Sequence, residues 1–467
     1  PMPADFDDAF ELHTFDAAGP SLPPGIGPPH HPPGLIGGSP HSGTASSPPP
    51  SGTAPPASAL ASAISFAASR ASARLLDLFL GRFRLGEHLH NLKGYLLLGK
   101  GDFVQGLMEP LLPQLSKPAS QLHRHHLLAL VESAVRACTS PAAAAAGGGN
   151  LGGGGGSGWV RGGSEAELLL LEHLGVTLSA APGATGWEAF SLDYRADPPL
   201  SAVLPPPCIA EYRRAFTLLW RLKRVELSLS AVWRKHTTAA RLSEGGRPDA
   251  LMHGCHVLRS EMIHFVFNLQ YYLMFEVIEC SWEELMSSLA SAANLDAVIA
   301  AHGAFLTAVI TGALLSPDNA PLLESLNRLF ETILRFAKAQ DLLYMHMLEQ
   351  RAAAKQLAAS AAANTAGGRW GCTGSDAAAT LLSAGAPPPL HPQFRQQLAT
   401  HAAQYKRQFT AFFEQVTRHP SLDLAFLSFR LDFNSYYESF SPAAGPDGHR
   451  NPLTPDADSE GSGTPRG

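Results

Sequence analysis

The sequence predicts an all-α protein: an elongated bundle of stacked long helices, interrupted by disordered inserts rich in Gly, Pro and Ala. Three observations indicate this fold class. Apolar residues recur at steps of three and four over long stretches, which is the period of an α-helix and not the alternation of a strand. No strand-turn-helix alternation accompanies them. The 43 Gly and 38 Pro residues of the 467-residue chain concentrate in a few tracts, so the expected disorder is local.

Composition divides the chain into foldable and unfoldable segments. Tracts of Pro, Gly, Ser and Ala cannot bury enough apolar surface to offset the entropy of ordering. We expect a disordered segment at 1–62, the helical start of the main domain at 63–140, a Gly-rich linker at 141–163, the main helical bundle at 164–351, an Ala/Pro-rich insert at 352–389, C-terminal helices at 390–440 and a disordered tail at 441–467.

The individual helices follow from their apolar spacing. In residues 75–98 and 122–137 the pattern is amphipathic, and Gly99-Lys100-Gly101 is too short for a phosphate loop and is typical of a helix-to-helix turn. The clearest stripes occupy residues 212–232, with Pro207 just before them, and 258–272. Further amphipathic stretches cover 282–292, 295–315, 322–350 and 394–417.

One span has the length of a membrane helix. Residues 297–317 contain no Asp, Glu, Lys or Arg. They do contain His302, two Gly and two Thr, and they are rich in Ala. We interpret this span as a buried helix and expect no membrane insertion.

The charge balance limits the classes of partner. Lys and Arg number 34 against 40 Asp and Glu, a formal net charge of −6, whereas nucleic-acid and anionic-membrane binders need a strong basic surplus. The five Cys are widely separated and form no C-x-x-C pair, which argues against a disulfide framework or a zinc knuckle. We therefore expect a reducing compartment and no nucleic-acid partner.

No motif predicts catalysis or a cofactor. Residues 147–163 are Gly-rich but lack the phosphate-loop pattern, and we interpret them as a flexible linker. The two His clusters, at 123–126 and 253–256, lack a second half at metal-ligand spacing. Paired carboxylates such as Glu276 with Glu279 fit a solvated helix face better than general acid/base chemistry. We predict no enzyme, no metal and no cofactor.

Two segments are candidates for partner binding. The basic amphipathic helix at 213–235 fits a core helix with a basic outer face; an acidic protein partner, nucleic acid or lipid are the alternatives left open. Residues 426–437 are unusually aromatic and fit a packed C-terminal helix, a recognition surface or both.

Five blocks in order resemble the C-terminal half of the gamma-tubulin complex proteins, across roughly residues 64–440. They are LKGYLLLGKGDF at 92–103, GWEAFSLDY at 186–194, WRLKRVE at 220–226, the run 262–272, and FRLDFN at 429–434. The versions at 97–103 and 275–282 look most like the third component, with the second component as the alternative.

The resemblance implies a scaffold and not a catalyst. It implies an all-helical domain that binds one gamma-tubulin. It also implies lateral contact with other complex components, mainly through an N-terminal region. Any GTP would be held by gamma-tubulin. It also implies microtubule nucleation in the cytoplasm and cytoskeleton, at microtubule-organising centres and spindle poles. A generic helical tethering or adaptor protein of membrane trafficking is the rival hypothesis.

For the gamma-tubulin contact we predict one primary and one secondary set of residues. The primary set is Arg430, Asp432, Asn434, Tyr436 and Tyr437. The secondary set is an electrostatic patch of Arg221, Lys223 and Arg224.

Overall fold

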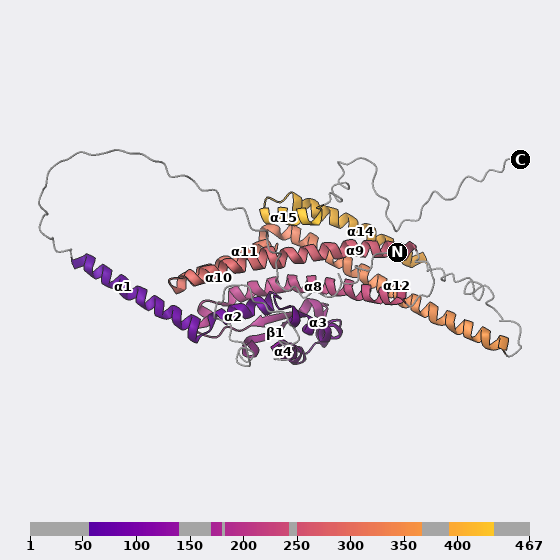
Figure 1. Cartoon of the computed structure of the whole chain (residues 1–467), viewed down its shortest axis with the longest axis horizontal. Coiled ribbons are helices and arrows are strands. Elements are labelled where there is room, and N and C mark those ends of the chain that lie inside the picture. The colour runs from indigo at the N-terminus through magenta and orange to yellow at the C-terminus, as the bar shows by residue number, and fades with distance from the viewer. Residues whose placement is uncertain (1–55, 140–169, 180–182, 242–249, 367–391, 434–467) are drawn as a thin grey trace, which may run out of the picture.

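The computed structural model describes residues 56–139, 170–179, 183–241, 250–366 and 392–433. These residues form an elongated helical body in which the long helices run side by side along its length (Figure 1). The first helix projects from one end, and the longest helix extends beyond the other (Figure 1). The predicted all-α fold class is confirmed.

The helices of the described residues include the long amphipathic stretches that the sequence predicts. They are α1 (Pro56–Asp77), α2 (Leu85–Asn91), α3 (Gly101–Leu115), α4 (Arg124–Thr139), α7 (Gly186–Ala189), α8 (Pro206–Arg241), α9 (Ala250–Tyr271), α10 (Cys280–Ser291), α11 (Leu295–Gly312), α12 (Ala320–Ala366), α14 (Pro392–Thr417) and α15 (Leu422–Leu431). Three π-helical segments, Leu78–Arg82, Leu92–Leu96 and Tyr272–Glu279, join some of them.

The apolar stripes form the core. On α8 the side chains of Tyr212, Phe216 and Leu222 are at most 1% exposed, as the helical spacing predicts. On α9 the stripe residues Met262 and Leu269 are fully buried. Burial of these faces against α12 and α14 provides the main stabilisation, because long helices gain more from packing than from intrinsic propensity.

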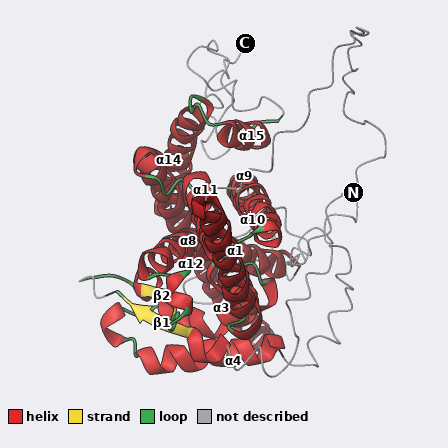
Figure 2. Cartoon of the chain, turned by 90° about the vertical axis from the view of Figure 1, so that its left-hand side faces the viewer, coloured by secondary structure: helices red, strands yellow, loops and turns green. Residues whose placement is uncertain are grey.

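A small antiparallel sheet is the main element that the sequence did not predict. Strand β1 (Leu174–Leu178) pairs with β2 (Phe190–Tyr194), with Val176 opposite Leu192. The two strands lie at the edge of the helical body near α4 (Figure 2). Each strand is only five residues long, so its alternation is too brief to distinguish from the surrounding helical pattern.

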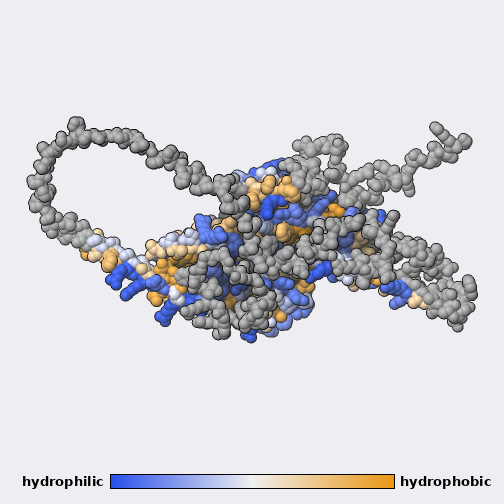
Figure 3. Space-filling view, viewed as in Figure 1, coloured by the Kyte–Doolittle hydropathy of each residue, from blue (hydrophilic) through white to orange (hydrophobic). Residues whose placement is uncertain are grey.

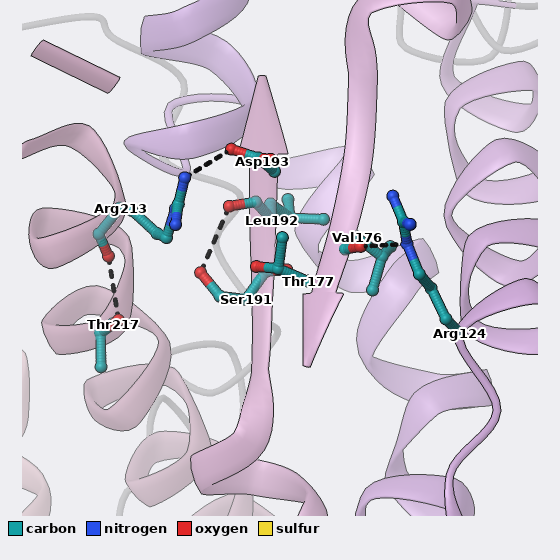
Figure 4. Close-up of polar contacts among 8 residues, drawn as sticks. All are labelled: Arg124, Val176, Thr177, Ser191, Leu192, Asp193, Arg213 and Thr217. Atoms are coloured by element: carbon teal, nitrogen blue, oxygen red, sulfur yellow. Dashed lines mark hydrogen bonds and ion pairs between the residues drawn. The ribbon is translucent and has the colours of Figure 1, made fainter. Parts of the chain in front are cut away.

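Side chains of three helices hold this hairpin in place. Arg124 at the start of α4 donates from Nε to the carbonyl of Val176 at 2.7 Å, and Arg213 of α8 pairs with Asp193 at 2.8 Å (Figure 4). Inside the fold, His88 Nδ1 lies 2.6 Å from the Tyr194 hydroxyl. The hairpin is therefore fixed to α2, α4 and α8.

A long π-helical segment lies between α9 and α10. The run from Ala250 to Ser291 is helical throughout, with Tyr272–Glu279 in π geometry. Lys93 of the second π segment pairs with Glu279, and its ammonium lies 4.9 Å from the Trp282 ring centroid. The ion pair thus joins two π-helical segments that are far apart in sequence.

Two helix ends differ from the segment boundaries we expected. Helix α1 begins at Pro56, before the boundary at 63, and α12 continues to Ala366, past the boundary at 351. Alanine has the highest helix propensity, which explains why the Ala-rich sequence extends α12. The Gly-rich linker and the C-terminal tail lie outside the described residues.

The apolar span forms α11 as expected, with Val298, Phe305 and Val309 at most 3% exposed. Within the described part of the chain, one helical stretch, Leu295–Glu349, contains a window long and apolar enough to cross a membrane by composition. Half of that window is buried inside the fold, as in a core helix of a globular protein.

Candidate partner-binding surface

Helix α15 is amphipathic in an unusual way, because its outer face is aromatic. Leu424 and Leu427 face the core and are at most 2% exposed. Phe426 is 42% exposed and Phe429 is 69% exposed, one turn apart. Phe433, one further turn along, is 68% exposed. A solvated outer face would normally carry polar residues, so the exposed face of this helix is unusually apolar.

Arg430 joins α15 to α9. Its guanidinium carbon lies 3.6 Å from the centroid of the Tyr271 ring and 5.5 Å from that of Phe426. Tyr271 in turn stacks on Phe275 at 4.7 Å. Arg430 Nη1 is buried without a hydrogen-bond partner, so the rings are the main contact that holds this cation.

The aromatic surface consists of side chains of α9 and α15 and of Phe433, which follows α15. We use this name for Phe267, Tyr271, Phe426, Phe429, Arg430 and Phe433. Phe267, one turn before Tyr271 on α9, is 51% exposed. In the space-filling view, hydrophobic atoms gather over α15 at the top of the molecule (Figure 3). Exposed aromatic residues beside an arginine are the residue types that dominate binding energy in protein interfaces.

Of the five residues in the primary set, the structure describes two, Arg430 and Asp432. Arg430 lies in the aromatic surface, as described above. Asp432 is 9% exposed, and its backbone N–H donates to the Ser428 carbonyl at 3.2 Å. Asn434, Tyr436 and Tyr437 lie outside the described residues.

The three basic residues of the secondary set each have a partner inside the fold. Arg221 donates from Nη1 to Asn327 of α12 at 3.0 Å. Lys223 pairs with Glu226 at 2.9 Å. Arg224 lies over Trp187 of α7 at 5.3 Å, and burial lowers its pKa from the ordinary value.

These basic residues point to different neighbours. With its amide oriented to satisfy both groups, Gln270 of α9 donates to Glu226 at 2.8 Å and accepts from Lys223 at 2.7 Å. Lys223 therefore faces α9, whereas Arg221 faces α12 and Arg224 faces α7. Their charges stabilise the packing of α8, and they do not converge on one exposed patch.

The remaining candidates are the histidine cluster at 123–126, possible metal sites and a small cavity. His123 and His125 stack at 5.6 Å at the exposed start of α4. Across the described ranges, no group of three or more His, Cys, Asp or Glu could hold a metal ion. A cavity of about 60 Å³ between α10 and α11 is lined mainly by small and apolar residues, including Ser281, Ala301 and Phe305.

The contribution of α9 was missed from the sequence. Phe267 and Tyr271 lie off the apolar stripe that runs through Phe265, Leu269 and Tyr272. Two aromatic residues on the face opposite a complete stripe are a signal of a second surface. This signal is visible in the sequence, but only the fold shows that α15 packs beside it.

The chain was compared with known proteins. A family profile described as "Gamma tubulin complex component C-terminal" matches residues 85–437. The chain is 36% identical over 371 residues to the gamma-tubulin complex component 3 homolog of Xenopus laevis, and 35% identical over 371 residues to gamma-tubulin complex component 3 of Homo sapiens. It is 35% identical over 279 residues to spindle pole body component 98 of Dictyostelium discoideum.

These matches cover most of the chain but a minor part of each relative. The first two cover 79% of the chain and 38% of the relative, and the third covers 59% and 31%. The chain thus spans about two fifths of the length of the first two relatives.

Proposed function

The chain belongs to the gamma-tubulin complex component family, and from this we propose that it is a scaffold that binds gamma-tubulin and supports microtubule nucleation. Its matches do not favour a generic tethering protein of membrane trafficking. We propose the third component as its type, since the relatives of Xenopus laevis and Homo sapiens carry that name. The site of action is the cytoplasm and cytoskeleton, at microtubule-organising centres and spindle poles, as the names of relatives suggest.

The observation that carries this proposal is the aromatic surface within the family-matched region. It is exposed, it lies on two helices fixed to the core, and it contains the residue types of binding hot spots. Arg430, Asp432, Asn434, Tyr436 and Tyr437 remain the proposed contact residues, now joined by Phe267, Phe429 and Phe433. Arg221, Lys223 and Arg224 remain a secondary proposal as separate contacts, since their side chains face different neighbours.

The mechanism is positional. Each scaffold chain holds one gamma-tubulin, and lateral contact with other components, mainly through regions of the relatives that this chain does not match, sets several gamma-tubulins in one geometry. Assembly of the first turn of a polymer then costs less entropy than assembly from free subunits. The chain itself performs no catalysis in this proposal, and any GTP belongs to gamma-tubulin.

The test is co-elution of the chain with purified gamma-tubulin on size exclusion, at low and high salt. We expect a one-to-one complex. Because Phe429 and Phe433 are each more than two-thirds exposed, their joint substitution by Ala should weaken binding by roughly tenfold or more. Arg430→Met should also weaken binding, because Tyr271 and Phe426 lose the cation between them.

A matched control uses exposed apolar residues elsewhere. Leu60 and Ile64 on α1 are 64% and 60% exposed, and their joint substitution by Ala should leave binding unchanged. Separate elution of the wild-type chain and gamma-tubulin would contradict the proposed function. A complex that survives F429A/F433A unchanged would contradict the aromatic surface alone. Strong weakening by salt would favour the charged residues instead.

A further inference from the structure

A buried arginine lies where α8, α9 and α12 meet. Arg259 of α9 is 1% exposed. Its guanidinium carbon lies 4.9 Å from the Trp233 ring of α8, and Nη2 donates to Nδ1 of His256. Nη1 is buried without a hydrogen-bond partner. Among the described residues, the groups that face the Arg259 charge are the Trp233 ring, the His256 imidazole and the Cys255 thiol.

Two histidines surround this cation. His256 is perpendicular to Trp233 at 6.2 Å and to His236 at 5.8 Å. His236 of α8 is 2% exposed and lies 5.7 Å from the ring of Tyr344 of α12. Because Nδ1 of His256 accepts from Arg259, His256 must be neutral with its proton on Nε2.

The remaining polar groups around the cluster come from all three helices. Gln340 of α12 donates to the Cys255 carbonyl of α9 at 3.4 Å. Lys235 of α8 pairs with Asp341 of α12 closer to the surface, where both are about two-fifths exposed. His253 of α9 is exposed. The carboxylate of Asp341 would favour a protonated His236, but Asp341 already pairs with Lys235.

We propose that Arg259, His256 and His236 form an acid-sensitive lock, which holds α8, α9 and α12 together while both histidines are neutral and releases the first turns of α9 when they gain protons. Protonation of His256 removes the acceptor of the Arg259 hydrogen bond. It also places a second cation beside a buried guanidinium, and His236 would add a third. The lock is independent of the aromatic surface and of the proposed partner.

The direction of the pKa shifts agrees with this geometry. Burial, followed by the charge of Arg259, lowers the pKa of both histidines to about 4. Burial also lowers the pKa of Arg259 to about 10, which leaves it charged throughout the range in question. An exposed histidine has a pKa near 6.5, so the site opens more readily as pH falls from 6.5 towards 4. At pH 5 the equilibrium constant for opening should rise by roughly 30-fold for one histidine.

The test is hydrogen exchange of the whole chain at pH 7.5 and pH 5, corrected for intrinsic exchange rates. We expect amides at 252–260 to lose at least tenfold more protection on acidification than amides of α3. In the double variant H236F/H256N this extra loss should disappear, because Phe cannot titrate and Asn keeps an acceptor for Arg259. The control H126N removes an exposed histidine from another helix, α4, and should behave as the wild type.

An equal acid response in the wild type and the double variant would overturn the proposal. If the double variant does not fold, NMR titration of the imidazole protons in the wild type decides instead. Midpoints near 6.5 for His236 and His256 would overturn the lock, and midpoints below 5 that coincide with loss of α9 protection would support it.

Discussion

At the residue scale, Gly312 shows how closely α11 packs on the π-helical segment Tyr272–Glu279. A Cβ at this position would lie 2.8 Å from Cγ1 and 2.9 Å from Cγ2 of Val277. The Gly312 carbonyl also accepts a hydrogen bond from the Tyr272 hydroxyl at 3.0 Å. The absence of a side chain at Gly312 therefore allows the Val277 side chain to pack directly on the backbone of α11.

This contact leads to a matched pair of substitutions within α11. We expect Gly312→Ala to lower the free energy of unfolding by about 1–3 kcal/mol, because the methyl group overpacks the contact with Val277. Gly303→Ala should raise it by up to about 1 kcal/mol, because Gly303 is exposed with nothing within 4 Å of the added Cβ, and Ala favours the helix. Urea denaturation of both variants checks the pair, and equal effects of the same sign would contradict the packing argument.

At the element scale, α12 has a part that packs on the helical body and a part that extends away from it (Figure 1). Over much of its length it packs on α8 and α14. His346 contacts Phe394 near the start of α14, at 5.4 Å between ring centroids. Beyond it, Ala352 and Ala359 are exposed, and the helix extends away from the body (Figure 1). Only the packed part should contribute to the cooperative stability of the fold.

Proline substitutions distinguish the two parts of α12. Lys338 and Ala359 are both exposed and both helical. Lys338→Pro should cost about 3 kcal/mol or more and lower Tm, because it breaks the helix where it packs. Ala359→Pro should leave Tm unchanged and reduce only the helical signal in circular dichroism. A fall in Tm for Ala359→Pro similar to that for Lys338→Pro would show that the far end is part of the cooperative core.

The long helices could be predicted from sequence, whereas the shorter elements could not. The stripes of α8 and α9 are long enough for the 3.6-residue period to stand out, and both helices form as expected. Strands β1 and β2 are five residues each and depend on anchors such as Arg124 and Arg213, which come from distant segments. The π geometry of Tyr272–Glu279 depends on tertiary contacts, and its apolar sequence does not specify it.

The same limit applies to the candidate site. The aromatic character of α15 is visible in the sequence, and Arg430 was predicted from it. Its contact with Tyr271 joins positions 159 residues apart, and local pattern carries no information on such a pairing. The basic residues of α8 show the converse: their charges are visible, but their partners inside the fold, such as Asn327 and Trp187, are not.

At the scale of the whole molecule, buried histidines make the fold sensitive to acid. Burial lowers the pKa of His302 to about 4, and burial together with His173 and Arg84 lowers that of His88 to about 4. Both are 1% exposed. The folded state therefore binds fewer protons than the unfolded chain, whose histidines have a pKa near 6.5.

The expected consequence is a loss of stability in a defined pH window. The contribution of these groups is complete above pH 6.5 and is lost as pH falls towards 4, by about 2 kcal/mol at pH 5 for each histidine. Burial raises the pKa of Glu261, which acts in the opposite direction. Urea midpoints measured from pH 7.5 to pH 4.5 check this, and a flat profile would contradict it.

The order of the helices along the chain has a consequence for synthesis. The aromatic surface needs α9 and α15, and α15 is the last helix that the structure describes. During translation, Phe267 and Tyr271 leave the ribosome well before Phe429 and Arg430, so the surface is complete only when nearly all of the described chain has emerged. A message that stops before α15 yields a chain with only the α9 part of the surface, Phe267 and Tyr271. If the proposed partner binds this surface, its capture requires a chain that includes α15, and products truncated before α15 would not compete for it.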